Sequence, residues 1–214
     1  MTDQQIYINQ FAFSVIDEHM VDEGFNNEIG VDLNTGFVFG GNIHNCGTWM
    51  DKMGSSPEAQ NKGQPATPRD GSAVELIGLS YSSLRWLAEM NAQGHYKYSS
   101  VTRVNLDSST TQWTLKEWTN KIEANFEQNY YVIRNLPNER SPELINKEHI
   151  YKDTFNSGHP WTDYQLRCNY PITMAVAPEL FDVKHAWGAL QIARVKLLGP
   201  LGMATLDPDD WTYR

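Results

Sequence analysis

The chain has 214 residues, of which 40% are apolar, 20% charged and 12% aromatic, a composition that excludes a disordered linker and suits one folded domain. Its 17 basic and 26 acidic residues give a net charge of −9, which argues against nucleic acid and anionic membranes as partners but not against a sugar. Without a signal-peptide pattern or an apolar stretch long enough to span a bilayer, we expect a cytoplasmic protein with two reduced cysteines, Cys46 and Cys168.

The N-terminal third is predicted to contain a helix, a hairpin and a long loop. Apolar residues at helical spacing predict a helix over residues 4–20. Residues 24–42 alternate around a turn at 32–36, which predicts a β-hairpin. Residues 43–71 are rich in Gly, Pro, Ser and Asn, and a loop of this length in a compact domain is either functional or disordered. Its apolar residues favour a packed, functional loop; they are Trp49, Met50 and Met53.

Two capping boxes predict helix starts in the middle of the chain. Ser72 and Glu75 predict a helix that ends near Asn91, and residues 95–113 look like an extended excursion. Thr114 and Glu117 predict a second helix. The apolar residues of that second helix follow a near-heptad spacing: Leu115, Trp118, Ile122, Phe126 and Tyr130.

The C-terminal third is predicted to hold two more helices after a Pro-, Asn- and Gly-rich connection over residues 134–160. Pro171 begins a short helix that runs to Ala177, and Asp182 caps a longer one that ends at Gly199 and Pro200. There is no βαβ alternation. The whole pattern predicts an all-α fold with elaborate loops, in which helix ends and connections line a site.

The first candidate site lies in the long loop, where Trp49 and Asp51 are separated by one residue. A carboxyl held against an indole face is poorly solvated, so its pKa rises, as a general acid requires near neutral pH. The indole also offers a flat face to a pyranose ring. Alternatively, Asp51 makes a local Asx-turn beside a buried tryptophan.

The second candidate lies just before the first capping box, where Arg69 and Asp70 stand side by side at a helix entrance. Together they can donate to and accept from vicinal hydroxyl groups. Alternatively they form a local ion pair in an entry turn. Glu75 has the same two readings, because it can complete the capping box or accept a hydroxyl.

The third candidate is the segment 160–170, in which polar or aromatic residues occupy alternate positions. If the segment is extended, these residues share one face and form a surface suited to carbohydrate; otherwise they form a solvated polar edge. The residues are Trp161, Asp163, Gln165, Arg167 and Asn169. Neither the Asp32–Gly36 turn nor His44 and Cys46 complete a metal-ligand pattern, so we expect no metal and no other cofactor.

Four strings carry a family resemblance across roughly residues 19–211, and their order along the chain is that of the family. They begin with CGTWMDKMG (46–54) and TPRDGSAVE (67–75), and continue through residues 150–170 and 177–210. In these strings the chain resembles the C-terminal glucosidase part of eukaryotic-type glycogen debranching enzymes.

The resemblance implies an (α/α)6 toroid whose loops hold the site, and hydrolysis, with inversion, of the single α-1,6-linked glucose left at a trimmed glycogen branch point. It assigns Asp51 as the general acid. It places nine further residues at the glucose subsite: Trp49, Arg69, Asp70, Glu75, Trp161, Asp163, Gln165, Arg167 and Asn169. No cofactor is implied, and the partners are glycogen or limit dextrin and the rest of the enzyme chain.

The family's second catalytic carboxylate lies in a later Trp-rich segment, and its glucanotransferase domain lies upstream. From the resemblance we therefore expect residues 1–214 to be one C-terminally truncated glucosidase domain, a partial toroid that is inactive alone because its general base lies beyond Arg214. The alternative is a catalytically dead glucan-binding module. In either case Asp51, Arg69 and Asp163 are expected to converge on one cavity.

Overall fold

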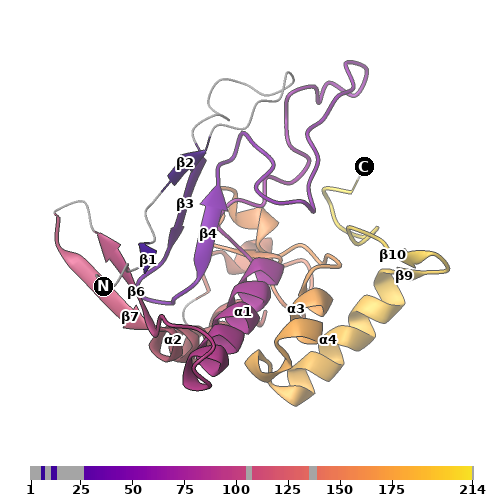
Figure 1. Cartoon of the computed structure of the whole chain (residues 1–214). Coiled ribbons are helices and arrows are strands. Elements are labelled where there is room, and N and C mark those ends of the chain that lie inside the picture. The colour runs from indigo at the N-terminus through magenta and orange to yellow at the C-terminus, as the bar shows by residue number, and fades with distance from the viewer. Residues whose placement is uncertain (1–5, 8–10, 14–26, 105–107, 135–138, 214) are drawn as a thin grey trace.

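The computed structural model describes residues 6–7, 11–13, 27–104, 108–134 and 139–213, and shows helices packed beside several small sheets (Figure 1). The helices are α1 (Val74–Ala92), α2 (Leu115–Tyr130), α3 (Tyr170–Val176) and α4 (Val183–Lys196). Short 3-10 turns are η2 (Pro142–Leu144), η3 (Pro160–Thr162) and η4 (Pro178–Leu180). The strands are β1 (Ile6–Tyr7), β2 (Phe11–Phe13), β3 (Asn27–Val31), β4 (Val38–Gly41), β5 (Ser72–Ala73), β6 (Ser100–Val104), β7 (Thr110–Thr114), β8 (Thr154–Phe155), β9 (Leu198–Gly199) and β10 (Gly202–Met203).

The prediction of an all-α fold forming part of an (α/α)6 toroid is wrong. Helix accounts for 36% and strand for 17% of the structure, and the strands form sheets ordered β1-β6-β7, β2-β3-β4, β5-β8 and β10-β9. These strands have two to five residues each, too short for an alternating pattern to stand out. Their partners are also distant: Ser72 of β5 pairs with Phe155 of β8, and Ile6 of β1 with Val101 of β6.

The N-terminal segments differ in how well the sequence predicts them. Within the expected helix at 4–20 the described residues form β1 and β2 instead, and the remaining residues lie outside the described part of the chain. The hairpin is confirmed, because β3 and β4 pair antiparallel with Val31 opposite Val38. Its turn is held by Asp32, which accepts hydrogen bonds from the Asn34 N–H and the Thr35 hydroxyl.

The two central helices are where expected, but only one has the expected cap. The Thr114 hydroxyl accepts from the Glu117 N–H (3.1 Å) while the Glu117 carboxylate accepts from the Thr114 N–H (2.7 Å), which confirms the second capping box. At α1 the prediction is wrong. The N-cap is Ala73, with no side-chain cap, and Ser72 belongs to β5.

The C-terminal helices α3 and α4 and the Asp182 cap are confirmed, since the Asp182 carboxylate accepts from the N–H groups of Lys184 and His185. The expected end of the longer helix at Gly199 and Pro200 is wrong, because α4 ends at Lys196 and Leu198–Gly199 form β9. No helix in the described part of the chain is long and apolar enough to cross a membrane.

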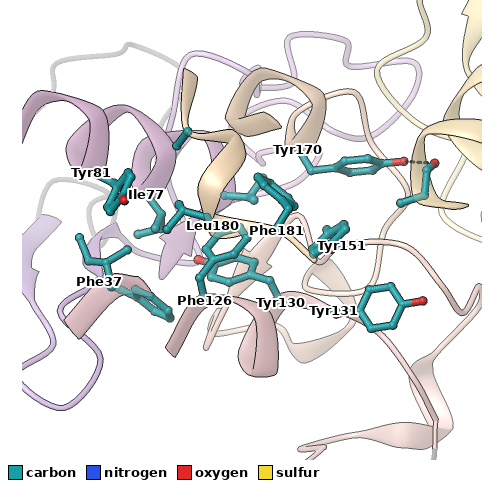
Figure 2. Packing of buried hydrophobic residues seen from close by; sticks show 14 of the residues in the cluster. Phe37, Ile77, Tyr81, Phe126, Tyr130, Tyr131, Tyr151, Tyr170, Leu180 and Phe181 are labelled. Atoms are coloured by element: carbon teal, nitrogen blue, oxygen red, sulfur yellow. Dashed lines mark hydrogen bonds between the residues drawn. The ribbon is translucent and has the colours of Figure 1, made fainter. Parts of the chain in front are cut away.

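The core is a cluster of aromatic and aliphatic side chains, most of them from α1, α2 and the 150–181 segment (Figure 2). Every predicted apolar residue of α2 is buried, and Phe126 stacks on Tyr130 with ring centroids 4.7 Å apart. The Tyr130 hydroxyl donates to the Ser72 carbonyl oxygen (2.7 Å), so a core ring also satisfies a backbone acceptor beside the candidate site. This packing fixes the start of α1 against β8, where the polar segments meet.

Candidate active site

The long loop at 43–71 is ordered by its own backbone hydrogen bonds. The Gly54 N–H donates to the Gln64 oxygen (2.8 Å), the Gly63 N–H to the Gly54 oxygen (2.9 Å) and the Ala66 N–H to the Lys52 oxygen (3.3 Å). This ladder closes an exposed tip at 57–62. Asp51 precedes Lys52 and Thr67 follows Ala66, so Asp51 and Thr67 face each other at the base of the loop.

Asp51 joins the two sides of this loop. Its Oδ1 accepts from the Thr67 N–H (3.1 Å), whereas its Oδ2 is buried and has no hydrogen-bond donor among the described residues. Burial raises the pKa of the Asp51 carboxyl, although the N–H groups of Lys52 and Thr67 and the Arg167 charge partly oppose this. Trp49 is 72% exposed, so the loop itself, and not the Trp49 indole, buries the carboxyl.

The raised pKa predicts a stability change in the Asp51→Asn variant. A carboxyl whose pKa is higher in the folded than in the unfolded protein stabilises the fold below its unfolded pKa, and that contribution is lost as pH rises through the folded pKa. The amide keeps an acceptor for the Thr67 N–H and carries no charge. We therefore expect the variant to unfold at a higher temperature than wild type at about pH 7, by a margin that narrows toward about pH 4.

Thermal unfolding followed by circular dichroism at several pH values measures this difference. Asp209→Asn is a control of opposite sign, because Lys196 lowers the pKa of the exposed Asp209 carboxyl, so this variant gains no stability at neutral pH. An Asp51→Asn margin that stays constant with pH would contradict the assignment of a buried, pKa-raised carboxyl.

Arg69 is completely buried and is the centre of a charged network. Its guanidinium donates to both oxygens of Glu75 (2.5 and 2.6 Å), to both oxygens of Asp153 (2.6 and 3.2 Å) and to the Thr48 hydroxyl (2.6 Å). Although burial alone lowers the pKa of Arg69, Asp153 and Glu75 together raise it, so the guanidinium stays charged. The Arg69 backbone has a positive φ of 49°, a strained geometry that the network holds in place.

Asp153 is the site residue that the sequence reasoning missed. It is 2% exposed and, besides Arg69, its Oδ1 accepts from the Asn169 amide (2.6 Å) while its Oδ2 lies 3.5 Å from Arg167 Nε. It lies within the 150–170 string that carries the family resemblance, but in a connection with no periodic pattern. Two adjacent charged residues, Lys152 and Asp153, between Tyr151 and Thr154 were the available signal.

Asp70 and Asp163 are both buried and bind the adjacent residues Gly158 and Ser157. Asp70 Oδ2 accepts from the Gly158 N–H (2.7 Å), an approach that only glycine allows because a Cβ there would lie 2.7 Å from the same oxygen. Asp70 Oδ1 is buried without a donor among the described residues. Asp163 Oδ1 accepts from the Thr154 hydroxyl (2.8 Å) and the Ser157 N–H (3.2 Å). Burial raises the pKa of both carboxyls.

The 161–169 segment is not extended throughout, because Trp161 lies in η3 and Asp163 in the turn that follows. Beyond that turn only Gln165 and Arg167 share partners, because Asn169 has a helical backbone conformation at the N-cap of α3. Gln165 Oε1 accepts from the Thr67 hydroxyl (3.3 Å), and Arg167 donates to the same hydroxyl (2.9 Å) and to the Met50 oxygen (2.9 Å). Gln165 and Arg167 thus connect this segment to the Asp51 loop through Thr67.

The expectation that Asp51, Arg69 and Asp163 converge on one cavity is wrong, although most of the predicted polar residues are connected by hydrogen bonds. A cavity of about 580 Å³ lies between the hairpin and α1, with Ile29, Phe39 and Leu76 among its mainly apolar lining. Arg69 lines it, but Asp51 and Asp163 do not. The polar network lies beside this cavity, and Asp51 and Asp70 each have one buried oxygen without a hydrogen-bond partner among the described residues.

Comparisons with known proteins agree with the resemblance. A family model described as amylo-alpha-1,6-glucosidase matches residues 3–214. The chain is also 46% identical, over 204 residues, to the glycogen debranching enzyme of Saccharomyces cerevisiae (strain ATCC 204508 / S288c). That match covers 93% of this chain and 13% of the yeast enzyme, so the chain spans about an eighth of the length of this relative.

Proposed function

Because the chain belongs to the amylo-alpha-1,6-glucosidase family, we propose that it supplies the general acid and part of the sugar subsite of a glycosidase that removes α-1,6-linked glucose from trimmed glycogen branch points. The observation that carries this proposal is the Asp51 carboxyl, which has one oxygen fixed by the Thr67 N–H, the other unpaired, and a raised pKa. A carboxyl that stays protonated at higher pH than usual suits proton donation to a leaving group.

In the proposed reaction Asp51 gives its proton to the glycosidic oxygen as the bond from that oxygen to the glucose C1 breaks. A water molecule attacks C1 from the opposite face while a second carboxylate takes its proton, so the configuration inverts. Inverting enzymes place their two carboxyl groups about 6.5–9.5 Å apart to make room for this water. After proton transfer, Arg167, which contributes positive charge near Asp51, helps to stabilise the carboxylate that forms.

For substrate binding, the predicted residues fall into two groups: those that contact the sugar and those that position them. Asp70 has one oxygen without a hydrogen-bond partner, and because this oxygen is buried it accepts a glucose hydroxyl in this proposal only once the segment around it opens. The exposed Trp49 and the half-buried Trp161 offer ring faces. The buried residues that already form hydrogen bonds to protein groups hold the others in position. They are Arg69, Glu75, Asp163, Gln165, Arg167 and Asn169.

We propose that the general base comes from a part of the longer enzyme outside residues 1–214. Three buried carboxylates of the described network are engaged, since Glu75 and Asp153 bind Arg69, and Asp163 accepts from Thr154 and Ser157. A carboxylate that already neutralises a buried arginine is a poor base. This engagement also favours the second candidate function, a glucan-binding module without hydrolytic activity.

Anomeric analysis of the released sugar tests the proposal and separates the two functions. We expect the full-length protein to release glucose from a limit dextrin that carries single α-1,6-linked glucose units, with β-glucose appearing first in proton NMR spectra because inversion converts the α linkage. Initial α-glucose would contradict the inverting mechanism. Binding of limit dextrin without glucose release would favour the glucan-binding module.

A further inference from the structure

Cys46 is a side chain that the proposed reaction does not use, although it contacts the proposed proton donor. Its thiol donates a hydrogen bond to the Asp51 carboxyl. Cys46 is half-buried and lines the cavity of about 580 Å³ between the hairpin and α1, together with Gly47 and Thr48. One side chain therefore contacts both this cavity and the carboxyl that is proposed to act as the acid.

The backbone on both sides fixes the contact between Cys46 and Asp51. The N–H of Gly47, the next residue after Cys46, donates to the Pro68 oxygen (2.6 Å), an approach that requires glycine because a Cβ there would lie 2.7 Å from the same oxygen. At the other end the Asp51 N–H donates to the Thr48 oxygen (3.3 Å), which closes a turn over residues 48–51. The Thr48 hydroxyl is in turn held by the buried guanidinium (2.6 Å). The thiol and the carboxyl therefore lie in one short segment that is anchored at several points.

A thiol in this position favours the ionised form of the carboxyl, because a carboxylate oxygen is a stronger acceptor than a protonated carboxyl. Burial raises the pKa of Asp51, and the groups that face it oppose this rise. These groups are the N–H donors of Lys52 and Thr67 in the same loop, the Arg167 charge from the 161–169 segment, and the Cys46 thiol. Arg167 alone among them carries a charge, so Cys46 is the neutral side-chain donor of the set.

We infer that Cys46 is a positioning residue for the proposed acid: its thiol orients the Asp51 carboxyl and stabilises the carboxylate that remains after proton transfer, an inference that rests on the proposed function for the reaction it serves. The thiol forms and breaks no covalent bond and acts only through Asp51. Without this donor Asp51 keeps its proton to a higher pH, so the pH range of the reaction reports on the contact.

The pH dependence of kcat/KM for glucose release from a limit dextrin tests this inference in the full-length protein. Cys46→Ala removes the donor and is expected to move the alkaline limb of the profile upward by about half a pH unit. Cys46→Ser supplies a hydroxyl donor and should return the limb close to its wild-type position. The matched control is Cys168→Ala, because Cys168 is also half-buried but its thiol lies 3.6 Å from the Asn169 side-chain oxygen, and this variant should leave the limb in place.

A second measurement needs no activity and separates failure of this inference from failure of the proposed function. Thermal unfolding of the full chain is compared for Asp51→Asn in the wild-type and the Cys46→Ala backgrounds. A buried carboxylate that has lost the thiol donor destabilises the fold more at neutral pH. We therefore expect Asp51→Asn to raise the unfolding temperature at about pH 7 by about 2 °C more in the Cys46→Ala background, and the two backgrounds to converge toward about pH 4.

Equal gains from Asp51→Asn in the two backgrounds at pH 7 would overturn the inference. An alkaline limb that Cys46→Ala leaves unmoved, or that Cys168→Ala moves equally far, would also overturn it. A larger gain in the Cys46→Ala background, in a protein that releases no glucose, would support the contact between the thiol and the carboxyl and would count against the proposed function.

Discussion

Replacing Asp51 with asparagine is expected to lower the rate of glucose release from a limit dextrin about a thousandfold, with little change in dextrin binding. The amide keeps the acceptor for the Thr67 N–H, so the loop keeps its shape, but it has no proton to give to the leaving oxygen. The loss should therefore fall on kcat and not on KM. Steady-state assays of released glucose with the full-length protein measure both constants.

The control for this variant is Asp32→Asn. Asp32 holds the hairpin turn through Asn34 and Thr35 and takes no part in the proposed reaction, so glucose release should stay near the wild-type rate. Wild type should also lose activity as pH rises through the raised pKa of Asp51, since the carboxyl then has no proton to donate. Wild-type turnover by Asp51→Asn would remove Asp51 from the mechanism.

The second large effect is expected at Asp153. Asp153→Ala removes the partner of a fully buried guanidinium and of the Asn169 amide, and leaving such a charge uncompensated costs about 3–5 kcal/mol of folding free energy. Glu75 still contacts Arg69 but cannot occupy the Nε side that Asp153 binds. Urea denaturation followed by tryptophan fluorescence measures the loss.

A milder variant keeps the experiment informative if Asp153→Ala does not fold. Asp153→Asn keeps one acceptor oxygen and loses the charge, so it should fall between wild type and Asp153→Ala. Asp209→Ala is the matched control, because it breaks an ion pair with Lys196 at the surface, where screening leaves little net stabilisation. Equal urea midpoints for Asp153→Ala and Asp209→Ala would show that the buried network does not stabilise the fold.

Local signals in the sequence predict local structure well here. The capping box at Thr114 and the near-heptad spacing from Leu115 to Tyr130 predict both the start and the buried face of α2. Asp182 does the same for the start of α4. In each case the residues that form the feature lie within a few turns of one another, so their spacing alone carries the information.

Features that depend on distant residues are the ones that sequence reasoning missed. Ser72 and Glu75 match a capping box, but β8 pairs with Ser72 and Arg69 takes Glu75, so tertiary contacts override the local motif. Asp153 lies 84 positions from Arg69 in sequence, and no spacing rule joins them. The all-α prediction is wrong for the same reason, because the paired strands are short and far apart.

The backbone hydrogen bonds between Lys52 and Ala66 divide the loop into a fixed base and an exposed tip. They fix the segment that carries Asp51, while residues 57–62 beyond them are exposed and make their hydrogen bonds locally. Insertions and deletions are tolerated best at such tips. A longer or shorter tip is therefore expected to leave Asp51, at the base of the loop, in place.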